Sequence, residues 1–176
     1  MAGRFRFNSG MKRIIALLLA AAFAGMPAAA QDTDATKGLS GLPTPRWVSI
    51  ASGEANMRAG PGEAYPVTWT YRRKGLPVEV IREWGIWRQV RDPDGETGWM
   101  NKNLLSGKRT AMVRGKVANL YARAEFSSPP VWRAEPGVVA DIQVCDEGWC
   151  RLSLGGRNGY VLAVDLWGVY KGETIN

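Results

Sequence analysis

The side chains that could perform catalysis are few in this chain of 176 residues. It contains no histidine, which excludes both a Ser-His-Asp triad and a Cys-His pair. Three carboxylates lie close together at Asp92, Asp94 and Glu96, and glycoside hydrolysis requires such a pair. However, Asp92-Pro93-Asp94-Gly95 is typical of a solvated hairpin turn. We interpret the carboxylates as part of a turn, and we expect a protein that is not an enzyme and needs no cofactor.

The two cysteines, Cys145 and Cys150, are the other reactive groups. Two thiolates without a histidine make a poor zinc site, and their C-x4-C spacing is wider than that of a redox-active dithiol. In an oxidising compartment, a pair this close in sequence is first interpreted as a disulfide. We therefore favour a structural disulfide over a metal site or a redox dithiol.

The first 30 residues predict export. Four basic residues precede an apolar run at residues 14–24, and Ala28-Ala29-Ala30 follows it. A basic segment, a short apolar core and an A-x-A end make a secretory signal peptide. A run of about a dozen residues is too short to cross a hydrocarbon layer of ~30 Å comfortably. We favour cleavage near Ala30 over retention as a membrane anchor, and we expect a periplasmic or secreted protein without membrane attachment. Either Met1 or Met11 could be the true start.

The charge of the chain depends strongly on this segment. The chain has 23 basic and 16 acidic residues, a formal net charge of +7. Cleavage after residue 30 removes four basic residues and no acidic ones, which leaves 19 against 16 and a net charge of +3. So mild a bias does not indicate nucleic acid as a partner.

The rest of the chain predicts an all-β protein. Residues 31–46 are polar and contain Gly and Pro, which is typical of a flexible leader. From residue 47 onward, short apolar runs are broken at intervals of about eight to twelve residues by Gly, Pro, Asp or Asn, as in β-barrels and sandwiches. We expect strands near 47–51, 55–58, 66–72, 77–82, 86–91 and 97–100, and again near 111–116, 118–121, 130–133, 138–144, 149–154 and 159–162.

An internal repeat accounts for the two sets of strands. The matched motifs include Ala55-Asn56-Met57 with Ala118-Asn119-Leu120, Trp69 with Trp132, Trp87 with Trp149, and Gly98-Trp99-Met100 with Gly159-Tyr160-Val161. Each copy has about 60 residues, close to the lower limit for a self-sufficient core. Two copies side by side could therefore cover each other's weak faces.

The order and spacing of these motifs resemble the bacterial SH3 domain family over residues 47–170. The residues that carry the resemblance are Asn56-Met57-Arg58-Ala59-Gly60-Pro61-Gly62, Val78-Glu79-Val80, Trp87-Arg88-Gln89-Val90 and Gly98-Trp99-Met100 in the first copy, and Asn119, Gly137, Trp149, Gly159-Tyr160-Val161 and Leu166 in the second. The resemblance implies two tandem small SH3-like β-barrels at 47–107 and 110–170, followed by a tail at 171–176.

The resemblance also implies a binding module, with cell-wall peptidoglycan as the leading ligand through its peptides or its glycan. The alternative is an adaptor that binds an envelope protein and not the wall. We expect a monomer in either case.

Aromatic side chains are the candidate contacts, because flat rings provide contact area at low entropic cost. Trp84 lies at the tip of a predicted hairpin and has the best claim to exposure, whereas Trp99 and Tyr160 are expected to pack in the cores. Arg58 and Tyr65 flank the Gly-Pro-Gly turn and could meet a peptide carboxylate, although a structural role for Arg58 is equally open. The candidate set is Arg58, Tyr65, Trp69, Trp84, Tyr121 and Trp132.

The alignment of the copies gives one more prediction. Cys145 and Cys150 correspond to Glu83 and Arg88 in the first copy. If the cysteines face each other across a hairpin, Glu83 and Arg88 should form a cross-strand ion pair. Simple alternation would put the two cysteines on opposite faces, so the strand must twist or bulge to bring them together.

Overall fold

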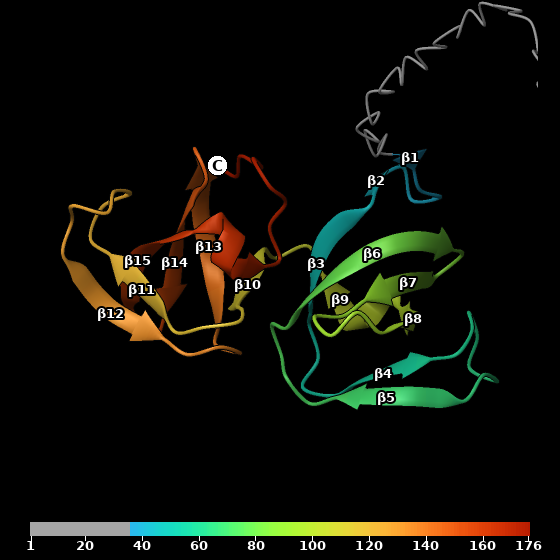
Figure 1. Cartoon of the computed structure of the whole chain (residues 1–176). Helices are drawn as coiled ribbons and strands as arrows, with labels where there is room; N and C mark the ends of the chain where they lie inside the picture. The colour runs from blue at the N-terminus through green and yellow to red at the C-terminus, as the bar shows by residue number, and fades with distance from the viewer. Residues whose placement is uncertain (1–35) are drawn as a thin grey trace, which may run out of the picture. The chain divides into compact units, whose positions relative to one another are not determined.

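A computed structural model describes residues 36–176 of the protein (Figure 1). The signal peptide predicted at residues 1–30 lies outside the described residues. Both repeats belong to one compact unit. Within residues 36–176, no helix is long and apolar enough to cross a membrane.

The first repeat folds into a seven-stranded antiparallel sheet with the order β5-β4-β8-β7-β6-β3-β9 (Figure 1). Its elements are β3 (Arg46–Ile50), β4 (Ala55–Arg58), β5 (Val67–Tyr71), β6 (Pro77–Trp84), β7 (Trp87–Arg91), β8 (Thr97–Asn101), the 3-10 helix η1 (Lys102–Leu104) and β9 (Leu105–Ser106).

The second repeat has the same topology, with the order β12-β11-β15-β14-β13-β10-β16. Its elements are β10 (Thr110–Val113), β11 (Ala118–Tyr121), β12 (Pro130–Ala134), β13 (Val139–Asp146), β14 (Trp149–Leu154), β15 (Arg157–Leu162), the 3-10 helix η2 (Ala163–Asp165) and β16 (Leu166–Trp167). The predicted all-β fold with two tandem SH3-like barrels is confirmed. The expected strand 111–116 ends earlier, at Val113, because Gly115 takes a left-handed conformation with φ 69° and turns the chain.

Each barrel encloses its own apolar core. Met57 in β4 and Leu120 in β11 occupy corresponding positions, and both are fully buried. Gly98 and Gly159 lie against them. A Cβ on Gly98 would lie 2.5 Å from Cγ of Met57, and one on Gly159 would lie 2.7 Å from Cβ of Leu120. These contacts explain the glycine in the Gly-aromatic pair of each repeat, because only glycine lets a large apolar side chain fill the barrel at this point.

A bulge in each long hairpin decides which side chains meet. In β13 the pairing with β14 shifts between Ile142 and Val144, and Cys145 then lies directly opposite Cys150. The predicted disulfide is present, with the two Cα atoms 4.1 Å apart.

The first barrel repeats this arrangement with charged side chains. A register shift between Val80 and Arg82 in β6 places Glu83 opposite Arg88 in β7. Arg88 Nε lies 3.2 Å from Glu83 Oε1, which confirms the predicted ion pair. In each hairpin the bulge turns the two paired side chains to the same face of the sheet, which simple alternation along the strand would not do.

The outer ends of β6 and β13 extend past their neighbours β3 and β10, so each leaves unpaired backbone groups that need a cover. In the second barrel, the backbone N–H and C=O of Cys145 both bond to Ile175 at 2.9 Å. The expected tail at 171–176 therefore packs on its own barrel.

In the first barrel, the corresponding end of β6 is covered by residues that precede it. β1 (Thr36–Lys37) pairs with β2 (Pro43–Thr44), and Ser40 between them binds Glu83. This differs from the flexible leader expected over 31–46, since residues 36–46 are folded. Polar composition could not reveal that Ser40 and Arg46 have a buried carboxylate to bind.

Aromatic side chains join the two barrels. Trp47 of β3 lies edge-on to Trp167 of β16, with ring centroids 4.7 Å apart, and also contacts Tyr170 at 5.3 Å. Trp167 Nε1 donates to the Pro77 carbonyl at 3.0 Å, and the Tyr170 hydroxyl donates to Glu79 Oε1 at 2.9 Å. The two copies thus cover each other's weak faces, as their small size led us to expect.

The glycine contact predicts a large effect from a small change. Substitution Gly98→Ala would force a methyl group against Met57 and the Arg58 carbonyl, and we expect a loss of about 1–3 kcal/mol in the free energy of unfolding, as for other overpacked cores. Urea denaturation measures this loss. Gly107→Ala is the matched control, because a Cβ there meets nothing within 4 Å. Equal unfolding midpoints for the two variants would contradict this account of the packing.

Candidate functional site

Trp84 is presented to solvent at the end of β6, where β6 and β7 meet in a tight hairpin. Its side chain is 63% exposed, and Ile86 beside it is 49% exposed. Gly85 has φ 52°, the left-handed conformation that the tight turn requires. The expectation that Trp84 is exposed is confirmed.

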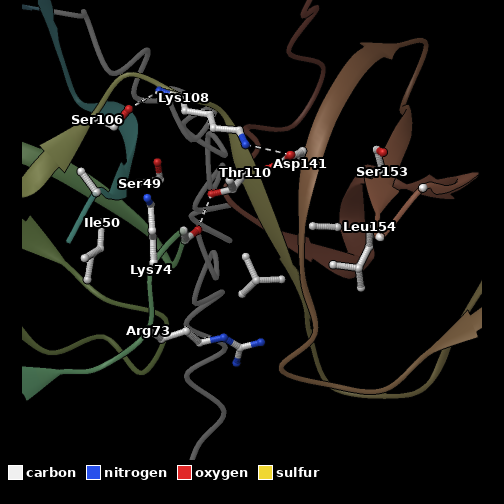
Figure 2. A pocket seen from close by; sticks show the side chains of 16 residues that line it. Ser49, Ile50, Arg73, Lys74, Ser106, Lys108, Thr110, Asp141, Ser153 and Leu154 are labelled. Carbon is white, nitrogen blue, oxygen red and sulfur yellow. Dashed lines mark hydrogen bonds and ion pairs between the residues drawn. The ribbon is translucent and has the colours of Figure 1, made fainter. Parts of the chain in front are cut away.

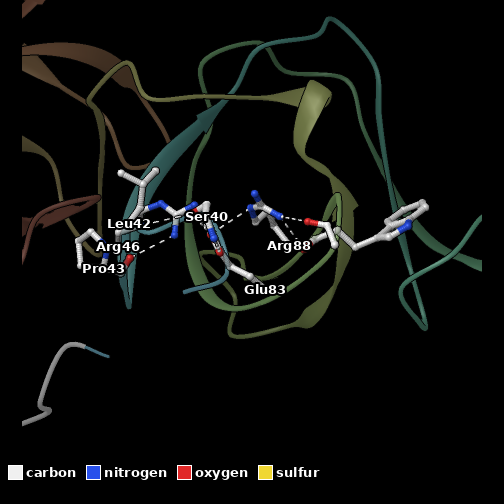
Figure 3. A network of polar contacts seen from close by, with 8 residues as sticks. Ser40, Leu42, Pro43, Arg46, Glu83 and Arg88 are labelled. Carbon is white, nitrogen blue, oxygen red and sulfur yellow. Dashed lines mark hydrogen bonds and ion pairs between the residues drawn. The ribbon is translucent and has the colours of Figure 1, made fainter. Parts of the chain in front are cut away.

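A buried carboxylate braces the base of this hairpin (Figure 3). The Glu83 side chain has no exposed surface, and its oxygens accept hydrogen bonds from the Ser40 backbone N–H at 2.7 Å and the Ser40 hydroxyl at 2.8 Å. The guanidinium groups of Arg46 and Arg88 lie 2.7 Å and 3.2 Å from Oε1. Arg88 also donates to the Gly85 carbonyl at 2.9 Å, so the same network holds both the base and the tip of the turn.

The partners of Glu83 determine its ionisation. Burial by itself would raise the pKa, but the two Ser40 donors, Arg46 and Arg88 hold the pKa of Glu83 below its usual range. The carboxylate is therefore charged at neutral pH. Because the folded-state pKa is lowered, the stabilisation from Glu83 is present above the unfolded-state pKa and is lost as the pH falls through the folded-state pKa.

Arg58 shapes the loop that follows β4. Its Nη1 donates to the carbonyls of Glu63 and Tyr65 at 3.0 Å and 2.8 Å. The Tyr65 ring lies so close to Gly60 that a Cβ there would overlap it, which explains why the turn needs a glycine. These contacts give Arg58 a structural role, while ligand binding by Arg58 or Tyr65 stays a prediction; the Tyr65 side chain is exposed to solvent.

Trp69 and Trp132 occupy corresponding positions on the edge strands β5 and β12 but differ in exposure. Trp69 is half exposed, whereas Trp132 packs on the second core and its buried indole N–H has no partner within residues 36–176. The structure brings Arg58 and Tyr65 together at the end of β4 and the loop after it. Trp69 lies on β5 and Trp84 on the β6–β7 hairpin, while Tyr121 and Trp132 belong to the second barrel.

Tyr121 belongs to an aromatic cluster that the sequence analysis missed. Its ring lies edge-on to Phe126 at 6.0 Å and to Trp149 at 5.8 Å, and Phe126 and Trp149 are 5.0 Å apart. Phe126 is 69% exposed. The available signal was a lone aromatic residue in the loop that corresponds to the Gly-Pro-Gly loop of the first copy.

Trp99 and Tyr160 are only half-buried, and Tyr160 lines a cavity of about 300 Å³ beside Trp149.

The acidic residues at 92–96 form a turn. Asp92 is buried, and its Oδ1 accepts the backbone N–H groups of Asp94 at 3.0 Å and Glu96 at 2.8 Å, while its Oδ2 accepts the Tyr71 hydroxyl at 2.8 Å. Burial, together with the Asp92 contact, raises the pKa of Tyr71, so this hydroxyl keeps its proton. Among residues 36–176, no group of three or more His, Cys, Asp or Glu side chains could hold a metal ion.

A larger cavity of about 670 Å³ is lined by residues from both barrels (Figure 2). Its walls come from the turn before β6, the linker between the repeats, the start of β13 and the β14–β15 turn. No residue in it belongs to the candidate set. Sequence reasoning missed this site because it depends on how one repeat packs against the other.

The fold and the internal repeat together define a protein of two tandem SH3-like barrels. The family of bacterial SH3 domains matches residues 51–107 and 114–168, which fall in the first and second barrels respectively. The chain belongs to the bacterial SH3 domain family.

Among curated proteins, the chain is 27% identical over 123 residues to the protein named "Putative N-acetylmuramoyl-L-alanine amidase YrvJ" from Bacillus subtilis (strain 168). The match covers 64% of this chain and 24% of that protein, so the chain spans about a quarter of its relative's length.

Two solved structures also match. NlpC1 from Trichomonas vaginalis is 18% identical, with 73% of this chain and 46% of that chain covered and a TM-score of 0.34. An NlpC/P60 family protein from Bacillus cereus ATCC 10987 is 14% identical, with 69% and 55% covered and a TM-score of 0.32. With TM-scores below 0.5, these two matches establish neither fold nor function for this chain.

The buried network around Glu83 predicts that loss of its charge lowers the stability of the protein strongly and in a pH-dependent way. Substitution Glu83→Gln removes the charge between Arg46 and Arg88, and we expect it to cost about 3–5 kcal/mol at neutral pH, as when one partner of a buried ion pair is lost. The measurement is urea denaturation at a series of pH values. The gap between wild type and variant should shrink as the pH falls below ~4.3, the ordinary value of a glutamate.

Glu54→Gln is the control for this experiment. Glu54 forms an ion pair with Arg72 in which both side chains are largely exposed, so its loss should cost no more than about 1 kcal/mol. Similar costs for the two variants, or a gap that does not change with pH, would show that Glu83 does not brace the hairpin.

Proposed function

We propose that this protein is an exported, non-catalytic module that binds cell-wall peptidoglycan through its peptides or its glycan. Two observations support this ligand class. The chain consists largely of two bacterial SH3 domains, and it is similar to about a quarter of a protein named as a putative N-acetylmuramoyl-L-alanine amidase. The predicted signal peptide would deliver the protein to the periplasm or the exterior, where the wall lies.

The observation that carries the proposal is the exposed Trp84 on a rigid support. An indole that is 63% exposed leaves apolar surface in water, and this surface is available to stack on a sugar ring or a peptide. The Glu83 network holds the hairpin in place, so little conformational entropy is lost when a ligand binds. Tyr65 and Trp69 expose two more rings on the first barrel and are further candidate contacts.

The second barrel presents a different surface. The position of Arg58 is taken by Tyr121, whose ring joins Phe126 and Trp149. The two modules therefore do not offer the same groups to a ligand, and we assign wall binding in the first place to the module that carries Trp84.

The test is co-sedimentation of the purified protein with protein-free peptidoglycan sacculi. We expect wild type to pellet and Trp84→Ala to bind about tenfold more weakly or worse, the size typical for removal of a central aromatic anchor. Ile86→Ala is the matched control, since it shortens an exposed side chain on the same hairpin, and it should pellet like wild type. Both variants should keep their urea midpoints, because both side chains are exposed.

Each outcome of this test is decisive. Wild-type protein that stays in the supernatant across a range of salt concentrations would overturn wall binding and leave the envelope-protein adaptor as the function to test. Pelleting that is equal for wild type and Trp84→Ala would keep wall binding but remove Trp84 from the site.

A further inference from the structure

The cavity that both barrels line has the size of a ligand site. Its volume of about 670 Å³ falls within the range of ~300–1,000 Å³ that is usual for small-ligand pockets. Ser49 and the turn Arg73–Gly75 form its wall on the first barrel (Figure 2). Asp141 and Ser153 lie on the opposite side, and Lys108 of the linker bounds it.

The side chains around the cavity carry a net positive charge. Lining residues include Arg73, Lys74 and Lys108, with Asp141 as the one acidic group. Lys108 Nζ lies 2.8 Å from Asp141 Oδ2, so these two charges neutralise each other. Arg73 and Lys74 form no ion pair or hydrogen bond through their side chains within residues 36–176, and both line the cavity (Figure 2). Two positive charges therefore remain for an anion.

The turn that carries these two charges is fixed to the second barrel. The Thr110 hydroxyl donates to the Gly75 carbonyl at 2.7 Å, and the Gly75 N–H donates to the Ile50 carbonyl at 2.7 Å. Arg73 and Lys74 thus extend from an anchored backbone, which lowers the entropic cost of holding them near a ligand.

The remaining lining is rich in hydroxyl groups and exposed backbone. Ser106 and Ser153 are partly exposed and offer hydroxyls from the first and the second barrel respectively. The β14–β15 turn at its rim is Gly155-Gly156, with φ 57° and 81°, and has no side chains to fill the opening. Hydroxyls and backbone groups are suited to a ligand that is itself rich in hydroxyl and amide groups.

We infer that this cavity binds the carboxylate of a sugar acid or glycopeptide, with Arg73 and Lys74 holding the carboxylate and the serine hydroxyls contacting the sugar. A guanidinium matches the planar geometry of a carboxylate and can bind both of its oxygens. The inference rests on the proposed function for the source of such a ligand, because glycopeptides of the wall combine sugar hydroxyls with free carboxylates.

A titration of the purified protein with N-acetylmuramoyl-L-alanine, followed by NMR, tests this inference. Its carboxamide form is the matched control ligand, with the same shape and no charge, and inorganic phosphate is the control anion. We expect chemical-shift changes at Gly155 and Gly156 with the acid, weakening as salt is added, and no saturation with the carboxamide or phosphate.

Variants locate the binding groups. The double substitution Arg73→Gln with Lys74→Gln should weaken binding of the acid by about tenfold, the usual size for loss of a charge-assisted contact. Arg72→Gln is the control, because Arg72 directly precedes this turn, pairs with Glu54 and does not line the cavity. It removes one positive charge, against two in the double variant, and should leave binding unchanged.

The outcomes separate this inference from the proposed function. Binding of the acid by a protein that does not pellet with sacculi would support the cavity and overturn wall binding. Pelleting without any response to the acid, or with an equal response from the double variant and wild type, would overturn the cavity site and leave wall binding intact. Equal affinity for phosphate, or for the carboxamide, would overturn the assignment of a carboxylate.

Discussion

The rest of this structure depends on one constraint: a barrel of about 60 residues must hold the two strands of its long hairpin together near the turn. Each barrel meets it at the same place, after a bulge in its longest strand. The second barrel uses the Cys145–Cys150 disulfide, and the first uses Glu83 and Arg88. A disulfide needs no further partner, whereas the oxygens of a buried carboxylate must accept hydrogen bonds from additional donors. Ser40 and Arg46 therefore fold back onto the first barrel.

The two barrels pack against each other for the same reason, because each is too small to bury all of its own apolar side chains. The first barrel alone does not cover Trp47, whose ring is buried by contacts with Trp167 and Tyr170 of the second repeat. Met112 and Val139 of the second repeat likewise pack against the first core. The curved surfaces of two barrels cannot match everywhere, and the space left beside these contacts is the cavity that Arg73 and Lys74 line.

The repeats share a fold but not a surface. A polar loop braced by Arg58 in one copy corresponds to a cluster of three rings in the other. Duplication of a small barrel thus provides two scaffolds with the same internal glycines and core positions, while their loops differ. Loop residues do not pack in the core, so they can vary without loss of the fold.

The sequence by itself determined the all-β class, the two copies, the disulfide and the ion pair that matches it, because strand periodicity and repeat offsets are local properties of the chain. It also identified Trp84 as exposed, since a bulky residue at a tight turn has no core to enter. Only the tertiary structure decided that residues 36–46 fold onto Glu83, that Trp132 is covered while Trp69 is exposed, and that a charged cavity lies beside Thr110 and Gly75. These features join residues that are 35 or more positions apart or depend on small differences in packing, and no local pattern records which distant residues will meet.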